Sequence, residues 1–557
     1  MFNRTAPVIK FPKEVSEDKH LAVLGVLNSS VACFWLKQVS HGKGNGGVNE
    51  GYRGEDWEEF YEFTGTKIQT FPLPSVLPLP LSRALDTRGQ RLGAHEPSAV
   101  CAADTTGPEI TAEPTSAPTR ARLDAAYASW AETRKQMISL QEELDWEVYH
   151  AYGLLTDAEK ARLTAPDPTD PDNPNPVPRI RLGERAFEIV LARKQKAGEI
   201  DTAWFERHGS TPITEIPDHW PDWYQEIVQA RIDIIDTRRD IALIERPECK
   251  RRWATDPWEK KEKAALRTWL LDRCEDRDLW FHLRDGLEQP RTLTVGQLAD
   301  ELTRQPDADD ISTVAGLYAA HLDKPNLTLE QVLLDATDAE HVPYLTAYRY
   351  KDSGLRKRAQ WEEVWDLQRE EDEDGERRDI PIPPKYTSAD FAKASYWSNR
   401  GKLDVPKERF ISYPDANPES DPTLLLGWAG WDHRDQALAL LNVVEDRRKR
   451  FDWQADKLVA LLAGLAELMP WLRQWFGEVD EEWGEESAAD EIGGFLDGEL
   501  ARLELSAADL AGWQPAKKGR GRKAVAKAVQ PALGTDDGAQ STSSSNDTDG
   551  NGEDNER

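Results

Sequence analysis

The sequence has few cysteines, no long apolar run and little positive charge. Its four cysteines, Cys33, Cys101, Cys249 and Cys274, are widely spaced and form no C-x-x-C pair. This spacing argues against a disulfide framework or a zinc ribbon and favours a reducing cytoplasm. No apolar run approaches the ~20 residues that span a bilayer, and residues 1–15 lack the apolar core of a signal peptide. We therefore expect a cytoplasmic protein with no membrane partner.

Positive charge is scarce overall, and it is distributed unevenly along the chain. The chain has 70 Lys and Arg against 101 Asp and Glu, a net charge of −31. Such a protein is repelled by DNA phosphates unless its positive charge is local. Residues 1–54 are locally positive, with seven Lys and Arg against four acids. Residues 477–499 contain ten acids and no Lys or Arg, which favours a solvated helix face over mimicry of DNA.

The most distinctive stretch runs from residue 21 to residue 74. Between Leu21 and Trp35, apolar residues recur at helical spacing and predict one apolar helix that ends near Lys37. Six glycines between positions 42 and 54 cannot continue that helix and predict a flexible polar loop. Aromatic residues follow, and Phe71 to Pro74 predicts a strand that ends in proline. Together these features suit a unit that reads a polar surface.

Motifs for catalysis are missing or incomplete. Glycines 42, 44 and 47 match G-x-G-x-x-G, but the dinucleotide fingerprint requires a preceding strand, and a helix is predicted here. The segments 256–258 (DPW) and 382–386 (IPPKY) match only part of the Asn/Asp-Pro-Pro-aromatic motif of amino-methyltransferases. The first has one proline, and Ile382 has no side-chain hydrogen-bonding group. We therefore predict no catalytic residue and no metal ligand in this chain.

The rest of the chain is predicted to be mostly helical. Leu123, Trp130, Met137 and Leu144 are seven residues apart and predict a helix of about nine turns, either a coiled-coil spacer or a core helix of a bundle. Capping boxes are expected at Thr156/Glu159, Thr294/Gln297 and Thr328/Gln331. Further helices are expected over 184–197, 221–244, 257–275, 295–304, 310–321, 328–337, 354–371, 388–399, 433–449 and 453–476, with short strands at 409–414 and 424–428.

Two residue types have competing interpretations. The 21 tryptophans are better explained by core packing than by nucleobase stacking, because basic residues are absent beside most of those in the last third. His433 lies in a dense polar cluster, which favours a hydrogen-bond network at a helix start over catalysis. Residues 516–557 have almost no apolar content and are predicted to be disordered.

Several long segments resemble a known family. CFWLKQVSHGKGNGGVNEGYRGEDWEEFYEFTGTKIQTFPLP and LQEELDWEVYHAYGL resemble the target-recognition and spacer portion of adenine-specific DNA methyltransferases. YLTAYRYKDSGLRKRAQWEEVWDLQ, LLLGWAGWDHRDQA and LAGLAELMPWLRQW are similar to the C-terminal region of the PglX family of type-2 BREX (phage growth limitation) phage-defence systems. The resemblance covers most of residues 15–515. In that family the methyl-donor site and the Asn-Pro-Pro-aromatic motif lie upstream, so we expect a C-terminal fragment or one half of a split gene.

The resemblance implies a mainly α fold with minor β (α+β) and a division into several parts. These are a partial target-recognition (DNA-specificity) domain at 1–80, a Pro-rich linker at 81–118, a helical spacer at 119–165, a second Pro-rich linker at 166–183, a helical C-terminal region at 184–405, a Trp-rich C-terminal subdomain at 406–515 and the disordered tail at 516–557. The last two-thirds of the chain is thus expected to be a large helical region.

The implied role is recognition of double-stranded DNA for N6-adenine methylation. We expect this chain alone to be inactive and to bind no cofactor, whereas the full-length family uses S-adenosylmethionine. Expected partners are DNA, an upstream methyltransferase fragment and other phage-defence proteins. The alternative is a non-enzymatic interaction module that docks such proteins through its acidic, Trp-rich C-terminal half. The candidate DNA contacts, against the simpler reading of a solvated loop, are Lys37, Ser40, Lys43, Asn45, Asn49 and Arg53.

Overall fold

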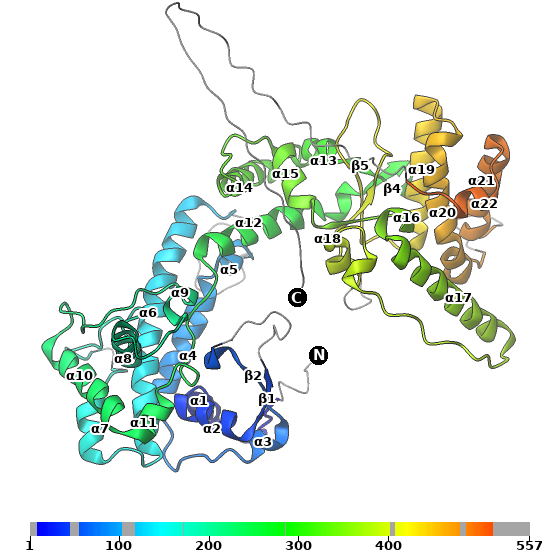
Figure 1. Cartoon of the computed structure of the whole chain (residues 1–557). Coiled ribbons are helices and arrows are strands. Elements are labelled where there is room, and N and C mark those ends of the chain that lie inside the picture. Colours follow the sequence, from blue (N-terminus) through cyan, green and yellow to red (C-terminus); the bar gives the residue numbers. More distant parts are fainter. Residues whose placement is uncertain are drawn as a thin grey trace, which may run out of the picture. The chain divides into compact units, whose positions relative to one another are not determined.

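The computed structural model is mostly helical with a few small sheets, which confirms the predicted mainly α class (Figure 1). The structure describes residues 8–44, 55–102, 117–170, 172–284, 286–401, 407–479 and 486–515. The predicted disordered tail, 516–557, lies outside these described residues.

The chain begins with two helices, α1 (Glu17–Leu27) and α2 (Ser30–Val39), where the sequence predicted one. The two are bent by 68° at a short break. The prediction of one continuous helix was wrong because the break has its own caps: Asn28 ends α1, and the Ser29 hydroxyl accepts from the Ala32 amide at 3.3 Å. Among the described helices, none alone is long and apolar enough to cross a membrane, and only this bent pair reaches that length and composition when its helices are combined.

A small hairpin follows α2. Strand β1 (His41–Gly44) pairs antiparallel with β2 (Phe60–Glu62), and the short helices η1 (Asp56–Glu58) and α3 (Gly65–Gln69) lie on either side of β2 in the sequence. The strand predicted at 71–74 does not form. Phe71 is instead buried edge-on against Trp35, with ring centroids 5.4 Å apart, so the segment is held by packing rather than by a sheet.

The stretch predicted as a linker at 81–118 contains helices in its described part. These are α4 (Leu79–Ala94) and α5 (Pro97–Ala102), and α4 packs along both α1 and α6. The linker prediction was wrong here because prolines were read as breakers, although Pro80 and Pro97 both stand in the first turn of a helix, where no backbone donor is required. Residues 103–116 lie outside the described residues.

Helix α6 (Arg120–Ala151) is the central helix of the first half. Leu144, Trp146 and Tyr149 are fully buried, and the helix contacts α2, α4, α5 and α7. It is therefore a core helix of a bundle rather than a coiled-coil spacer. The helices that follow it in the first half are α7 (Asp157–Leu163), α8 (Ala186–Lys196), α9 (Trp204–Arg207), α10 (Asp222–Thr237) and α11 (Arg239–Ile244).

The Pro-rich segment 166–183 has no described helix or strand but belongs to the same core. Val177 and Ile180 are buried together with residues of α6, α8 and α10. The Ser139 hydroxyl donates to the Pro178 carbonyl at 2.6 Å, which ties the segment to α6. The segment therefore connects helices of one core and does not separate two cores.

The second half is organised around a four-stranded sheet in the order β5-β8-β7-β6. Strand β6 (His341–Pro343) pairs in parallel with β7 (Phe410–Tyr413). Strand β8 (Leu425–Trp428) pairs antiparallel with β7 on one side and with β5 (Leu293–Thr294) on the other. A separate hairpin joins β3 (Phe281–Arg284) to β4 (Leu287–Pro290). The strands predicted at 409–414 and 424–428 are thus confirmed as β7 and β8.

The helices of the second half precede and follow these strands in the sequence, and most of them contribute to one core. They are α12 (Trp258–Cys274), η2 (Arg277–Leu279), α13 (Val295–Leu302), α14 (Ala308–Ala320), α15 (Leu329–Thr337), α16 (Thr346–Arg349), α17 (Asp352–Asp374), η3 (Ser388–Asp390), α18 (Ala394–Tyr396), η4 (Trp397–Gly401), α19 (His433–Phe451), α20 (Ala455–Trp475), α21 (Ala488–Leu503) and α22 (Ala507–Ala511). The three predicted capping boxes are all present, at Thr156, Thr294 and Thr328.

Candidate functional site

The structure places only part of the predicted DNA-contact set. The Lys37 ammonium donates to the Glu248 carbonyl at 2.6 Å and lies 5.0 Å from the Tyr61 ring centroid. Ser40 follows α2 directly, and its hydroxyl oxygen is buried with no hydrogen-bond partner among the described residues. The backbone of Lys43 lies in β1, but its side chain is outside the described part. Outside the described residues are Asn45, Asn49 and Arg53.

Two further arginines follow closely, in the sequence, the carbonyl that Lys37 contacts, and sequence reasoning missed them. Arg251 and Arg252 are exposed and follow α11, in the same segment as the carbonyl that Lys37 contacts. The Arg252 guanidinium lies 5.3 Å from the Trp57 ring centroid, and Arg251 donates to the Asn28 side chain at 3.0 Å. Neither forms an ion pair with a carboxylate within the described part of the chain.

We call Lys37, Arg251 and Arg252 the basic rim. Its sequence signal is the run Lys250-Arg251-Arg252-Trp253, in which basic residues adjoin an aromatic one. This pattern is typical of nucleic-acid contacts, but it lies 200 residues beyond the predicted recognition unit. Folding brings the two together through the contact between Lys37 and the Glu248 carbonyl.

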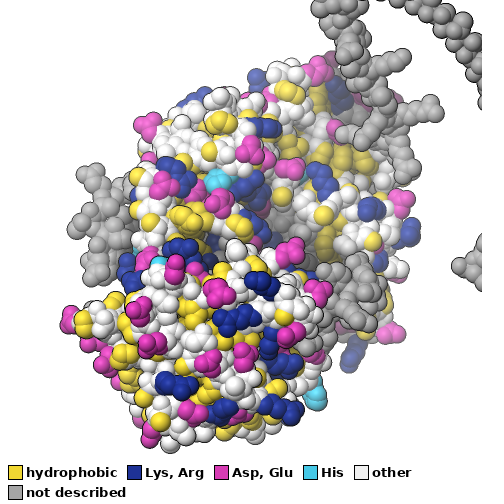
Figure 2. Space-filling view, turned by 60° about the vertical axis from the view of Figure 1, so that its left-hand side comes forward, with side chains coloured by type: hydrophobic (Ala, Val, Ile, Leu, Met, Phe, Trp, Pro, Cys, Tyr) yellow, Lys and Arg dark blue, Asp and Glu magenta, His cyan; other side chains and the backbone are white. Residues whose placement is uncertain are grey.

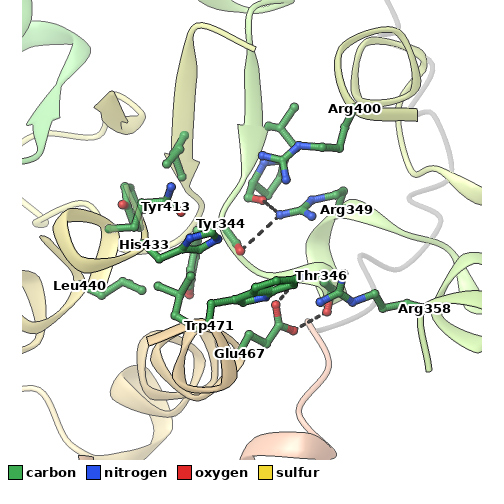
Figure 3. Close-up of a pocket in the computed structure, with 16 residues that line it drawn as sticks. Tyr344, Thr346, Arg349, Arg358, Arg400, Tyr413, His433, Leu440, Glu467 and Trp471 are labelled. Atoms are coloured by element: carbon green, nitrogen blue, oxygen red, sulfur yellow. Dashed lines mark hydrogen bonds between the residues drawn. The ribbon is translucent and has the colours of Figure 1, made fainter. Parts of the chain in front are cut away.

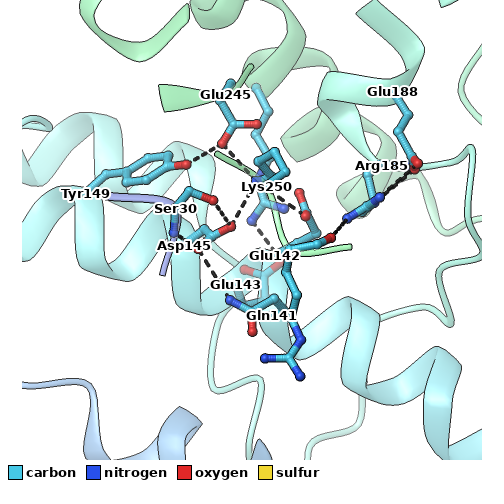
Figure 4. Close-up of polar contacts among 12 residues, drawn as sticks. Ser30, Gln141, Glu142, Glu143, Asp145, Tyr149, Arg185, Glu188, Glu245 and Lys250 are labelled. Atoms are coloured by element: carbon cyan, nitrogen blue, oxygen red, sulfur yellow. Dashed lines mark hydrogen bonds and ion pairs between the residues drawn. The ribbon is translucent and has the colours of Figure 1, made fainter. Parts of the chain in front are cut away.

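A buried polar network holds the basic rim in place (Figure 4). Asp145 of α6 accepts from the Ser30 amide at 2.9 Å and from the Ser30 hydroxyl at 2.6 Å, at the start of α2. The same carboxylate pairs with the Lys250 ammonium at 2.9 Å, and Lys250 pairs with Glu245 at 3.0 Å. Tyr149 donates to Glu245. The network therefore joins α2, α6 and the segment that carries Arg251 and Arg252.

The charges in this network are tightly coupled. Burial alone would lower the pKa of Lys250, but the carboxylates of Asp145, Glu142 and Glu245 outweigh burial and raise it. Burial raises the pKa of Glu142 to about 7, against the attraction of Lys250. The Lys250 and Glu142 side chains are 1% and 2% exposed, so water does not screen them. Lys250 thus stays charged and bound to its acids.

Two more buried pairs extend the network along α6 and α8. Arg185 and Glu188 form two charge-assisted hydrogen bonds, both at 2.9 Å, and Arg231 donates to Glu143 at 2.8 Å. Each side chain is at most 1% exposed. Such pairs do not stabilise a fold strongly, but removing one partner leaves a buried charge and costs about 3–5 kcal/mol. The Arg231–Glu143 pair joins α10 to α6, whereas the Arg185–Glu188 pair lies at the start of α8.

The described arrangement can position a ligand, because the buried network holds its cations in fixed places. Burial raises the pKa of Cys33, the thiol nearest the basic rim, which disfavours its reactive thiolate. Within the described residues, no group of three or more His, Cys, Asp or Glu could hold a metal ion. In the face shown in Figure 2, Lys and Arg are interspersed with Asp and Glu rather than gathered in one broad field. Any attraction for DNA must therefore be local.

The two proline segments that resembled a methyltransferase motif serve other roles. The Trp258 indole donates to Glu262 at 2.8 Å, and Asp256 pairs with Lys260 at 2.8 Å at the start of α12. Ile382 is 93% exposed. Neither segment presents an aromatic ring beside a polar group that is free to hold a base, so neither forms the motif.

Comparison with known proteins identifies the family. A family model described as "Domain of unknown function (DUF7008)" matches residues 137–524, more than half of the chain. The protein therefore belongs to the DUF7008 family. No solved structure matches it.

A curated relative adds a named protein to this family match. The chain is 49% identical over 536 residues to the adenine-specific methyltransferase PglX of Streptomyces coelicolor (strain ATCC BAA-471 / A3(2) / M145). The alignment covers 94% of this chain and 41% of the relative, so the chain spans less than half of that protein's length. The resemblance to the PglX family predicted from the sequence is confirmed.

Proposed function

We propose that this chain provides the DNA-recognition part of an adenine-specific (N6-adenine) DNA methyltransferase. The observation that carries the proposal is the 49% identity to PglX across 94% of the chain. We further propose that it acts in the cytoplasm, in a type-2 BREX phage-defence system, with double-stranded DNA as partner. An upstream methyltransferase fragment and other defence proteins would complete the assembly.

The basic rim supports a DNA-positioning role. Lys37, Arg251 and Arg252 can neutralise phosphates, while Asn45 and Asn49 can pair with adenine edges. Because the buried network ties α2 to the segment after α11, the rim is held in one arrangement before DNA arrives. A site that is already ordered loses less conformational entropy on binding.

The methyl donor of the proposed enzyme, S-adenosylmethionine, does not fit the described residues. Its expected setting is a glycine-rich turn between a parallel strand and a helix. In the part that the structure describes, the one parallel pair is β6 with β7, whose register joins only three residues of each strand. The segment after β6 begins Tyr344-Leu345-Thr346 and contains no glycine turn. We therefore assign donor binding to another part of the enzyme.

One observation favours the alternative of a protein-interaction module. Trp475, at the end of α20, is 64% exposed directly before the acidic stretch 477–499. Exposed tryptophans are enriched at protein interfaces, so this end of α20 could dock another defence protein. The two roles can coexist, because α20 packs into the core of the second half and α2 packs into the core of the first half.

The DNA role is tested by the salt dependence of binding. Each lost phosphate contact should reduce the slope of log affinity against log salt by about 0.9. We expect Arg251→Ala/Arg252→Ala to lower the slope by about 1.8 and Lys43→Ala/Arg53→Ala to lower it further. The measurement is duplex mobility shift with the purified chain across a salt series.

The charge-matched control for this test is Lys449→Ala/Lys457→Ala, which removes two exposed lysines from α19 and α20. It should leave the slope unchanged. An unchanged slope in the Arg251→Ala/Arg252→Ala variant would show that the basic rim faces solvent and contacts no phosphate. Stable co-purification of partner proteins without any DNA binding would favour the interaction module.

A further inference from the structure

A cavity that is remote in sequence from the basic rim lies in the second half of the chain. It has a volume of about 190 Å³ and lies among β6, β7, α16, α17, α19 and α20 (Figure 3). This is below the ~300–1,000 Å³ of pockets for drug-sized ligands. Three arginines and a single glutamate are the charged residues that line it, in a protein with a net charge of −31.

Arg349 is the most deeply buried of the three arginines. It is 8% exposed, and its Nη2 donates to the carbonyls of Pro343 at 2.9 Å and Tyr344 at 3.4 Å. Its Nε has no hydrogen-bond partner, and no carboxylate among the described residues lies within ion-pair distance. A buried cation held only by neutral carbonyls is costly unless an anion joins it.

The other two arginines approach the cavity from the same side as Arg349 (Figure 3). Arg358 pairs along α17 with Glu362 at 2.8 Å, and Arg400 pairs with Glu408. The Nε of Arg400 is also buried without a partner among the described residues. Burial, and then the nearby Arg349, lower the Arg400 pKa to about 9. The guanidinium groups are therefore close enough to repel one another.

The opposite wall is aromatic and carries one unused hydroxyl. The His433 ring stacks on Trp471 with centroids 5.5 Å apart, while Asp432 caps the start of α19. The Tyr344 hydroxyl is buried without a partner in the described part of the chain. A Cβ at Gly464 would lie 2.3 Å from the Tyr344 ring, so the glycine allows this tyrosine to reach the cavity.

Glu467 also lines the cavity, and its carboxylate would repel an anion bound there. Its carboxylate accepts from the Thr346 amide at 3.3 Å and from the Thr346 hydroxyl. Burial raises the pKa of Glu467, and Arg349 and Arg358 partly offset this. Three guanidinium groups and one carboxyl therefore line the cavity, and two arginine Nε atoms and the Tyr344 hydroxyl have no partner among the described residues.

We propose that this cavity binds a phosphate-like oxyanion, either as the free ion or as the terminal group of a mononucleotide. Guanidinium groups donate in pairs to phosphate oxygens, and arginine is the residue best suited to buried anions. The oxyanion would accept from the unpartnered Nε atoms of Arg349 and Arg400 and from the Tyr344 hydroxyl. The small volume restricts the occupant to a compact group. This inference does not depend on the DNA role.

Titration calorimetry of the whole chain with inorganic phosphate, and separately with adenosine 5′-monophosphate, tests the proposal. Saturable binding of phosphate alone would assign the site to the free ion. Binding of the mononucleotide at least tenfold more tightly would assign it to a carried phosphoryl group.

Three variants locate any binding that is seen. Arg358→Met should weaken binding about tenfold or more, since it removes one of the three positive charges that line the cavity. Arg369→Met is the matched control, because Arg369 also lies on α17, 4.9 Å from the Trp471 ring, but does not line the cavity. Glu467→Gln should tighten binding several-fold, because its amide oxygen can still accept from Thr346 while the opposing charge is gone.

Gain of affinity in Glu467→Gln cannot arise from loss of folding, so it keeps the test decisive even where an arginine variant folds poorly. The absence of saturable heat with both probes up to ~10 mM, a concentration that detects millimolar affinity, would overturn the proposal. Equal weakening by Arg358→Met and Arg369→Met would overturn it too, since general charge rather than the cavity would then attract the anion.

Discussion

At the scale of single residues, Glu142 determines how the buried network responds to pH. Its carboxyl lies 3.4 Å from the Lys250 ammonium, and neither of its oxygens has a hydrogen-bond partner among the described residues. Burial raises its pKa to about 7, above the value of 4.5 for a free glutamate. The folded state therefore binds more protons between these values. The resulting stability is complete below about pH 4.5 and is lost as the pH rises through about 7.

We expect Glu142→Gln to stabilise the protein at pH 8 and to flatten its stability between pH 5 and pH 7. The gain at pH 8 should be about 1–3 kcal/mol, since each pKa unit corresponds to ~1.4 kcal/mol. Urea unfolding at pH 5.5 and pH 8 measures both effects. Glu147→Gln, a change on the same helix at a side chain that is 27% exposed, is the control. Parallel pH profiles for parent and Glu142→Gln would contradict this account.

The buried roles of Ser30 and Asp145 could not be read from the sequence. Ser30 is 1% exposed and bonds to Asp145, which is 115 residues away in the sequence. Asp145 in turn meets Lys250 across 105 residues. Sequence periodicity reports which face of a helix is apolar, but it carries no information about which distant charge will pair with a polar residue. The network, and with it the basic rim, became visible only in the fold.

At the scale of elements, local signals were reliable where they depended on nearby residues. The boxes at Thr156, Thr294 and Thr328 were predictable because the cap and its partner are three residues apart. Strand β6 was missed because it has three residues and pairs with β7 about 70 residues later. Helix α4 was missed because its segment was assigned as a linker from its proline content, although a proline is compatible with the first turn of a helix.

Glu262 on α12 connects three helices. It accepts from Arg120 at the start of α6 at 2.6 and 2.9 Å, from His321 after α14 at 2.7 Å, and from the Trp258 indole at 2.8 Å. Burial would raise its pKa, but the hydrogen bonds from Arg120, His321 and Trp258 outweigh it and lower the pKa to about 2. The stability that this carboxylate contributes is present above about pH 4.5 and is lost as the pH falls through about 2.

We expect Glu262→Gln to destabilise the protein by about 2–3 kcal/mol at pH 7, the cost of losing hydrogen bonds to a charged acceptor. The difference in unfolding free energy between the variant and the parent should narrow below about pH 4. The reason is that Glu262 of the parent then becomes protonated and loses the stabilising effect of its charge. Thermal unfolding at pH 7 and at about pH 3 measures the narrowing. Glu259→Gln, an exposed acid in the first turn of α12, should change stability by less than about 1 kcal/mol. A constant difference at all pH values would show that Glu262 acts through packing rather than charge.

At the scale of the whole molecule, the net negative charge disfavours the proposed binding of DNA. The net charge of −31 opposes DNA binding, and Lys and Arg are dispersed among acids on the face in Figure 2. A recognition role therefore needs cations that are held in place and not paired with carboxylates, which describes Arg251 and Arg252. Salt at physiological strength screens the distant acids over about 8 Å, so the local rim can dominate its own surroundings.

The last prediction is that the chain alone does not methylate DNA. Methyl transfer to adenine N6 requires a bound donor, a pocket for the flipped base and groups that orient the amino nitrogen, all held at once. In the described residues Asp256 is paired with Lys260 and Ile382 is 93% exposed, so neither proline segment can supply the orienting groups. The chain spans 41% of the PglX relative, and we expect the remainder of such a protein to supply the donor site, the base pocket and the orienting groups.

The measurement is transfer of labelled methyl groups to unmethylated duplex DNA, with the 557-residue chain alone and with an added polypeptide that carries the donor site and an Asn-Pro-Pro-aromatic motif. We expect no turnover from the chain alone. If activity appears on addition, Arg251→Ala/Arg252→Ala should reduce it more at low salt than at high salt, because high salt already weakens the parent's phosphate contacts. Robust turnover by the chain alone, abolished by a substitution within it, would reveal a catalytic site and overturn the assignment of this chain to DNA positioning.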